Sequence, residues 1–230
     1  MANTPSPGFN LSNPKSYIQV PQHRAVITAR VGFKGLKFDQ ALEAPSKASN
    51  GLLWMTNMPV FTTHFVNARD AALGERTLYD AIGKPISRRQ AQDHWDYLSA
   101  GAGDLCSSWL DAKFIEINGE MYVETDHRFE QIKGETHFSG NKRSLRSHKH
   151  SGLVSLEFNK DGLATTPSSL DKYTQGENIY AVSPVDGRVA WFGANLGRAV
   201  LDCDRGPTFS NSNLGVFACA QKNLIGDLLK

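Results

Sequence analysis

The C-terminal part of the chain is divided into short apolar runs by polar turn residues. The runs read NIYAVSP, RVAWFGA, RAVLDC and LGVFACA, and each is bounded by Gly, Pro, Asp or Asn. Runs of this length with such boundaries are typical of short strands joined by loops. The sequence therefore predicts a fold whose C-terminal part is made of strands and loops.

A β-hairpin is predicted further upstream, in KFIEINGEMYVETD. Its two alternating runs meet at Asn118-Gly119, and an Asn-Gly pair is the strongest short-range signal for a two-residue hairpin turn. Phe114, Tyr122 and Val123 are expected on the apolar surface of this hairpin.

The clearest helix signal begins at Ser87. Ser87 precedes Gln90 by three residues, which is the spacing of a capping box, and Gly101 provides a stop. Four residues between them share one helical face: Ala91, His94, Trp95 and Leu98. This helix is predicted to pack through this face against a small sheet whose last strand includes residues 216–219.

A second, shorter helix is expected within residues 104–114, with Asp104 as its cap and Trp109 and Leu110 buried. Residues 61–73 are ambiguous, because Phe61 and Phe65 keep helical spacing whereas the first half of the segment is rich in β-formers. Together these patterns predict the α+β class, with two helices and small antiparallel sheets joined by long loops.

The length and charge of the chain limit the domain count and the partners. A chain of 230 residues with 40% hydrophobic content can bury one substantial core, so a single domain is expected over residues 17–230. Residues 1–16 are rich in Pro, Ser and Asn and are predicted to form an N-terminal arm. A formal net charge of +2 provides no basic face, so no nucleic-acid partner is expected.

The N-terminal segment MANTPSPGFNLSNPKSYIQV has neither the basic nor the apolar region of a secretory signal. No window of the sequence is long and apolar enough to span a bilayer. The expectation is a protein without membrane insertion, located in the cytoplasm or on a virion.

The best candidates for metal ligands are His148 and His150, with Asp126 and His127 upstream. Two imidazoles and a carboxylate would suit a divalent transition metal. The histidine pair lies, however, in the basic segment KRSLRSHKH, and no group that could orient the imidazoles is apparent. We therefore predict neither a metal site nor a cofactor.

Motifs of nucleophilic catalysis are missing from the sequence, which has no GxSxG, no Gly-rich phosphate loop and no HExxH. Cys106, Cys203 and Cys219 are widely spaced and odd in number, which indicates neither a disulfide framework nor a zinc ribbon. The acidic neighbours of Cys203 would raise the pKa of its thiol, the wrong direction for a nucleophile. The protein is expected not to be an enzyme.

Two segments resemble the formylglycine-generating-enzyme branch of the C-type lectin fold. SNLGVFACA, after RAVLDCDRGP, is similar to the closing segment of that branch, where a polar loop ends in an Asn-Leu-Gly turn and a final core strand. PISRRQAQDHWDYL is similar to its Trp-containing helix, with Ile86-Ser87 in place of the usual cap residues. The resemblance implies a C-type-lectin-like α+β fold.

Two groups of proteins share that fold: oxygen-dependent enzymes, and the variable proteins of diversity-generating retroelements. The active cysteines of the enzymes form a close pair before the closing turn. Here that segment holds only Cys203, and Cys219 lies beyond the turn. The catalytic function is therefore not carried over to this chain.

The composition of the C-terminal segment agrees with the second group. Retroelement diversification acts at adenines, mostly in Asn codons, and its substitutions do not reach Lys, Glu, Gln, Met or Trp. Residues 178–220 contain no Lys, Glu, Gln, Met or His, so Trp191 would be a constant position. Short buried strands also avoid long charged side chains, and this accounts for part of the depletion.

The resemblance thus implies a hypervariable ligand-binding region at about residues 188–214, used by a virus or phage for host or receptor recognition. Alternation along the strands predicts which side chains reach solvent. The predicted ligand-binding residues are Phe192, Asn195, Val200, Asp202, Asp204, Arg205, Phe209, Asn211 and Asn213. Four residues are expected to support them from beneath: Trp191, Leu201, Leu214 and Phe217.

The expected partner of this surface is a protein ligand. Two alternatives stay open from the sequence: an oxygen-dependent enzyme of the formylglycine-generating type, and a structural virion protein without a variable site.

Overall fold

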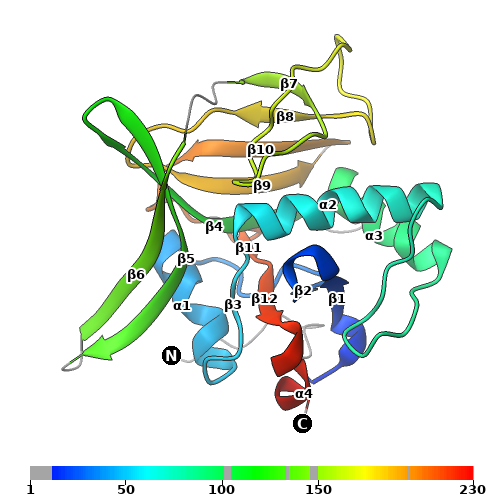
Figure 1. Ribbon diagram of the computed structural model, residues 1–230, viewed down its shortest axis with the longest axis horizontal. Helices are drawn as coiled ribbons and strands as arrows, with labels where there is room; N and C mark the ends of the chain where they lie inside the picture. Colours follow the sequence, from blue (N-terminus) through cyan, green and yellow to red (C-terminus); the bar gives the residue numbers. More distant parts are fainter. Residues whose placement is uncertain (1–11, 101–104, 133–134, 146–149, 196, 230) are drawn as a thin grey trace.

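The computed structural model describes residues 12–100, 105–132, 135–145, 150–195 and 197–229, and two β-sheets with a helical layer between them form its body (Figure 1). Helix α2 (Met58–Leu73) packs between the sheets. Phe61 and Phe65 of this helix contact Phe192 of the larger sheet, and the same core cluster includes Ile18 and Ile27 of the smaller one. The main hydrophobic core therefore lies on both sides of α2.

The larger sheet has eight strands, in the order β6-β5-β4-β9-β10-β8-β7, with β11 paired to β4. The pairs β8–β10 and β11–β4 are parallel and the others are antiparallel. The strands are β4 (Cys106–Ile117), β5 (Glu120–Ile132), β6 (Glu135–Ser144), β7 (Gly152–Ser155), β8 (Asn178–Val182), β9 (Val189–Asn195), β10 (Arg198–Arg205) and β11 (Gly215–Val216).

The smaller sheet is antiparallel and has four strands, in the order β1-β2-β12-β3. Its strands are β1 (Tyr17–Val20), β2 (Ala25–Thr28), β3 (Trp54–Met55) and β12 (Ala218–Gln221). Both faces of β2 are buried, since Ile27 belongs to the core around α2 and Val26 to a second core with α1 (Phe38–Ala48). This burial on both faces is why the strand is a continuous apolar run.

The remaining helices are short, apart from α3 (Arg88–Ala100). They are α4 (Ile225–Leu228) and the 3-10 helices η1 (Pro14–Ser16), η2 (Pro21–His23) and η3 (Lys222–Leu224). Of the predicted arm, residues 1–11 lie outside the described residues, and η1 forms in the remainder.

The helix predicted after Ser87 is confirmed as α3. The Gln90 backbone N–H donates to Ser87 Oγ at 3.3 Å, and the Ser87 N–H donates to Gln90 Oε1 at 3.1 Å, which completes the capping box. All four residues of the predicted face, from Ala91 to Leu98, are buried.

The predicted hairpin is also confirmed. Asn118 and Gly119 join β4 to β5 with φ of 53° and 79°, the positive values that a two-residue hairpin turn of this type requires. Phe114 and Val123 face each other across the hairpin and are buried, and Tyr122 is partly buried.

The predicted fold class is wrong. Strand predominates among the described residues, at 38% against 26% helix, and the principal sheet has eight strands rather than being one of several small sheets. The expected cap of the short helix, Asp104, lies outside the described residues, and residues 106–114, expected to be helical, form the first part of β4 instead. Trp109, Leu110 and Ala112 are buried together, because β4 is central in the sheet and covered on both faces, which removes the alternation that marks a strand.

The C-terminal strand also differs from the prediction, which placed residues 216–219 in one strand of a small sheet packed on α3. Val216 ends β11 in the larger sheet, and Ala218 begins β12 in the smaller one. Phe217 between them enters the core, with its ring 5.5 Å from that of Phe61. Helix α3 packs instead on β9 and β10 of the larger sheet.

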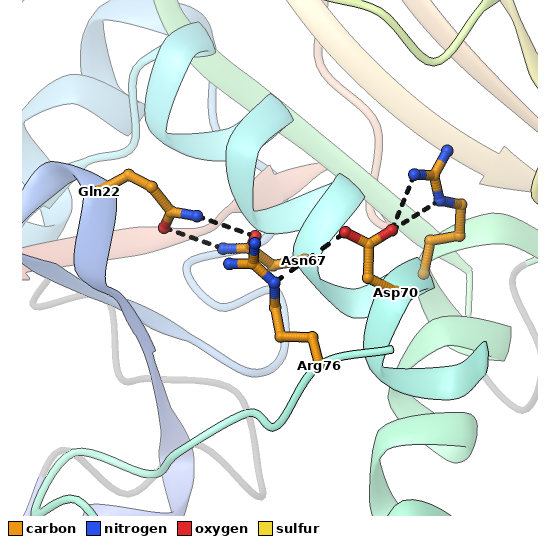
Figure 2. Close-up of polar contacts among 5 residues, drawn as sticks. Gln22, Asn67, Asp70 and Arg76 are labelled. Carbon is orange, nitrogen blue, oxygen red and sulfur yellow. Dashed lines mark hydrogen bonds and ion pairs between the residues drawn. The ribbon is translucent and has the colours of Figure 1, made fainter. Parts of the chain in front are cut away.

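A polar cluster attaches η2 to α2 (Figure 2). Gln22 and Asn67 exchange two amide hydrogen bonds, of 3.1 and 3.2 Å. One turn along, Asp70 accepts two hydrogen bonds from Arg69, and its second oxygen lies 4.0 Å from Nε of Arg76. The hydrogen bonds between Gln22 and Asn67 link η2 to α2, and the contacts of Asp70 stabilise the end of α2 beside them.

Within the described ranges, none of the helices has both the length and the apolar character needed to cross a membrane.

Candidate ligand-binding site

A pocket of about 280 Å³ opens where β9 and β10 meet the loop at residues 206–213. Successive side chains of a strand point to opposite faces, and Phe192 of β9 points into the core around α2. Trp191 and Gly193 therefore lie on the other face, where the pocket forms. The lining residues are Leu105, Cys106, Ser107, Trp191, Gly193, Ala194, Arg198, Val200, Arg205, Phe209, Asn211 and Asn213.

Trp191 is the largest side chain of the pocket, and its position is set by two neighbours. Its indole N–H donates to Ser107 Oγ on β4 at 2.9 Å. Its ring lies over Gly193, because a Cβ added to Gly193 would be 2.4 Å from two ring carbons. Only glycine leaves room for the indole to lie along the strand in this way.

Arg205 lies between two aromatic rings. Its guanidinium carbon is 4.8 Å from the ring centre of Trp191 and 5.1 Å from that of Phe209, both within the range of cation–π contacts. Nη2 of Arg205 donates to Asp202 at 2.8 Å, while Nε is buried and makes no hydrogen bond. Arg205 of β10 thus contacts Phe209 of the loop, and its Nε–H has no hydrogen-bond acceptor in the described structure.

Hydrogen bonds within the loop at residues 206–213 form two turns. The Phe209 N–H donates to the Gly206 carbonyl at 3.1 Å, and Asn211 Oδ1 accepts from the Asn213 N–H at 2.9 Å. Leu214 is buried immediately after the loop. Phe209, Asn211 and Asn213 are exposed between these anchors, so the loop presents their side chains on a fixed backbone.

The residues that line the pocket have a net positive charge. Arg198 and Arg205 line it and no acidic residue does. Arg198 lies 5.4 Å from the ring centre of Tyr180, which holds its guanidinium against the sheet. The site can therefore make cation, amide and aromatic contacts with a ligand.

The structure brings together five of the nine predicted ligand-binding residues. Val200, Arg205, Phe209, Asn211 and Asn213 all line the pocket.

The other four predicted residues have different positions. Asp202 does not line the pocket but holds Arg205, and Asp204 is exposed and pairs with Arg188 at 3.3 Å. The side chain of Asn195 lies outside the described part of the chain.

The prediction is wrong for Phe192, which is fully buried against Phe61 and Phe65. The predicted facing of β9 was inverted by one residue. Trp191 was expected beneath the surface and instead lines the pocket. Its indole fits there because Gly193 has no side chain in the space that the indole occupies. Leu201, Leu214 and Phe217 are buried as predicted.

Several pocket residues were not found from the sequence, among them Ser107 and Arg198. Ser107 belongs to a segment that was predicted to be helical, so its pairing with β9 could not be anticipated. The one local signal was Gly193, since an isolated glycine in a strand marks a close approach of another group.

The potential metal ligands are not brought together. The His127 ring contacts the buried carboxylate of Asp111, while Asp126 accepts from Asn57 at 2.6 Å; His148 lies outside the described residues. Across the described ranges, no group of three or more His, Cys, Asp or Glu side chains is placed to hold a metal ion.

The three cysteines are free and buried. Burial raises the pKa of the Cys106 thiol to about 12, although Cys106 lines the pocket. Burial, and then the charge of Asp202, raise the pKa of Cys203. Burial likewise raises that of Cys219. Each thiol is therefore held in its protonated, unreactive form at neutral pH.

Comparisons with known proteins found no matching family model, no matching curated protein and no matching solved structure.

Proposed function

We propose that the protein is a ligand-binding protein, not an enzyme, and that the pocket at β9, β10 and residues 206–213 is its recognition surface. The observation that carries the proposal is the position of Arg205 between Trp191 and Phe209, with Asn211 and Asn213 lining the same opening. Rigid aromatic and arginine anchors among adaptable amide groups are the composition of protein-binding surfaces.

We further propose that the exposed positions of this surface are diversified by a retroelement, with a protein as the ligand. Burial explains the absence of long charged side chains from the strands, since Val189, Ala190, Ala199 and Leu201 are all inside the molecule. The same absence at residues 208–213 has no such explanation, because all six residues are exposed. The diversified positions would then be concentrated in this loop.

The DNA beside the coding sequence tests the origin of the surface. We expect a near-copy of the codons for residues 188–214, differing at adenines, next to a reverse-transcriptase gene. The differing codons should be those of exposed residues such as Asn211 and Asn213, and not those of the buried Leu201 and Cys203. Differences concentrated at the codons of buried residues, or the absence of a near-copy, would contradict the proposal that a retroelement diversifies this surface.

A binding experiment tests the function itself. The wild-type protein is applied to an array of host-cell surface proteins, together with the double variant Phe209→Ser/Asn213→Ala. Exposed substitutions change stability by about 0.5 kcal/mol or less each, so the variant should keep its melting temperature and lose the wild-type signals. The matched control is Val185→Ser, which alters an exposed apolar residue that does not line the pocket. Wild-type signals that persist in the double variant would contradict the proposed surface.

A further inference from the structure

A second pocket, of about 320 Å³, shares no lining residue with the ligand-binding pocket. It lies where η1, the residues after β2 and the turn at residues 80–86 meet α3. Three cations from three separate segments line it: Lys15, Arg30 and Lys84. All three side chains are exposed, and all three line the same hollow.

None of these three cations has an ion pair with a described residue. Arg30 is held in place by an aromatic ring instead, with its guanidinium carbon 4.0 Å from the ring centre of Tyr97. Stacking of this kind uses the face of the guanidinium and leaves its N–H groups for an anion. Arg30 is therefore positioned by Tyr97 and not by an acidic partner among the described residues.

Two acidic residues also line the pocket, and one of them is already engaged. Asp80 Oδ1 accepts hydrogen bonds from the backbone N–H groups of Ile82 and Lys84, at 3.1 and 2.8 Å. This carboxylate closes the turn that presents Lys84. With three cations and two carboxylates, Asp80 and Asp93, the lining has a formal charge of 3 − 2 = +1.

The rest of the lining consists of four apolar residues, Gln90 and one buried imidazole. Ile18, Ala29, Pro85 and Ile86 provide the apolar surface. His94 of α3 is 6% exposed, and its Nε2 is hydrogen-bonded to His64 Nε2 at 2.8 Å. The lining thus combines cations that can bind an anion with apolar side chains that can contact an organic group.

We propose that this pocket binds a small organic phosphate, whose phosphate is held by Arg30, Lys84 and Lys15 and whose organic part lies against Ile18 and Ile86. A phosphate monoester has close to two negative charges at neutral pH and several acceptor oxygens, which suits three cations that have no ion pair with a described residue. The volume of the pocket exceeds what a bare phosphate needs.

Calorimetric titration with glycerol 3-phosphate tests the site, with glycerol as the uncharged counterpart and inorganic phosphate as the counterpart without an organic part. We expect saturable binding of glycerol 3-phosphate at millimolar concentration or below, weaker binding of inorganic phosphate and none of glycerol. Chloride at matched ionic strength should not compete. Absence of saturable binding of glycerol 3-phosphate, or equal binding of glycerol, would overturn the proposal.

Two variants assign the binding to this pocket. Lys84→Gln removes an exposed cation of the lining, and we expect about a tenfold weaker affinity, as is typical for the loss of one charged hydrogen bond. Lys172→Gln removes an exposed lysine that does not line this pocket and should change nothing. Both variants should keep the wild-type melting temperature. An equal loss of affinity in both would show non-specific attraction to the surface and would refute the site.

Discussion

At the scale of single residues, the proposed recognition surface depends on one glycine. Gly193 has no side chain, and the indole of Trp191 occupies the space that a Cβ would need. This close approach sets the indole beside Ser107 and beneath the guanidinium of Arg205. The identity of residue 193 thus decides whether the aromatic floor of the pocket can form.

We predict that Gly193→Ala destabilises the protein by about 1 to 3 kcal/mol, because a methyl group forced into an occupied space displaces its neighbour. Trp191 should leave Ser107, and the change in its environment should alter the tryptophan fluorescence of the native state. In a Trp191→Ala background the same glycine substitution should cost little, which urea unfolding of the four proteins measures as a double-mutant cycle. Equal costs in both backgrounds would show that the indole does not require Gly193.

At the scale of elements, the contact between α2 and α3 includes a buried pair of histidines. Their Nε2 atoms are 2.8 Å apart, so one ring donates a proton and the other accepts it. Burial lowers the pKa of His64 to about 3. Burial, then the proximity of His64 and Arg30, lowers the pKa of His94 well below its ordinary value. Both rings are therefore neutral in the folded protein near neutral pH.

This pair predicts a loss of stability as the pH falls below 6.5. In that range the unfolded chain binds protons at both histidines and the folded protein does not, so the free energy of unfolding decreases with decreasing pH. The expected loss at pH 5.5 is about 1.4 kcal/mol for each histidine with an ordinary unfolded pKa near 6.5. Denaturant unfolding at pH 7.5, 6.5 and 5.5 measures it.

The control for this prediction is the double variant His64→Asn/His94→Asn, which should be less stable but should lack most of the slope between pH 7.5 and 5.5. The comparison is needed because His127 acts in the opposite direction. Although its burial alone would lower its pKa, the carboxylate of Asp111 raises it overall, so its contribution is lost as the pH rises. An unchanged slope in the double variant would contradict the assignment to His64 and His94.

At the scale of the whole molecule, the two sheets are joined by a short crossing near the C-terminus. The chain passes from β11 in the larger sheet to β12 in the smaller sheet through the single residue Phe217. The ring of Phe217 lies 5.5 Å from Phe61 of α2 and 6.5 Å from Tyr97 of α3. One side chain thus packs against both helices of the central layer at the point where the chain changes sheet.

Phe217→Ala should cost about 3 to 5 kcal/mol of unfolding free energy, because it leaves a cavity in this fully buried position. Phe209→Ala is the matched control from the same segment, since Phe209 is 40% exposed and its loss should cost much less. Urea unfolding followed by circular dichroism measures both. Similar costs for the two variants would contradict the central role of the Phe217 crossing.

The features that could be predicted from the sequence are those that depend on neighbours along the chain. The capping box at Ser87, the buried face from Ala91 to Leu98 and the positive-φ turn at Asn118-Gly119 each involve atoms a few residues apart, so the local sequence contains their cause. Much of the pocket loop belongs to this class as well, because the polar run at residues 208–213 is too hydrophilic to be buried.

Only the tertiary structure decided which strands pair and which way β9 faces. The first part of β4 is an inner strand of the eight-stranded sheet and is covered on both faces, so it lacks the alternation that identified the second part of the strand. The facing of Phe192 and Trp191 depends on the distant Phe61 and on the room above Gly193. At such positions, packing against residues far along the chain outweighs the local sequence pattern. The strands of the site could therefore be placed only from the tertiary structure, whereas its loop could be predicted from the sequence.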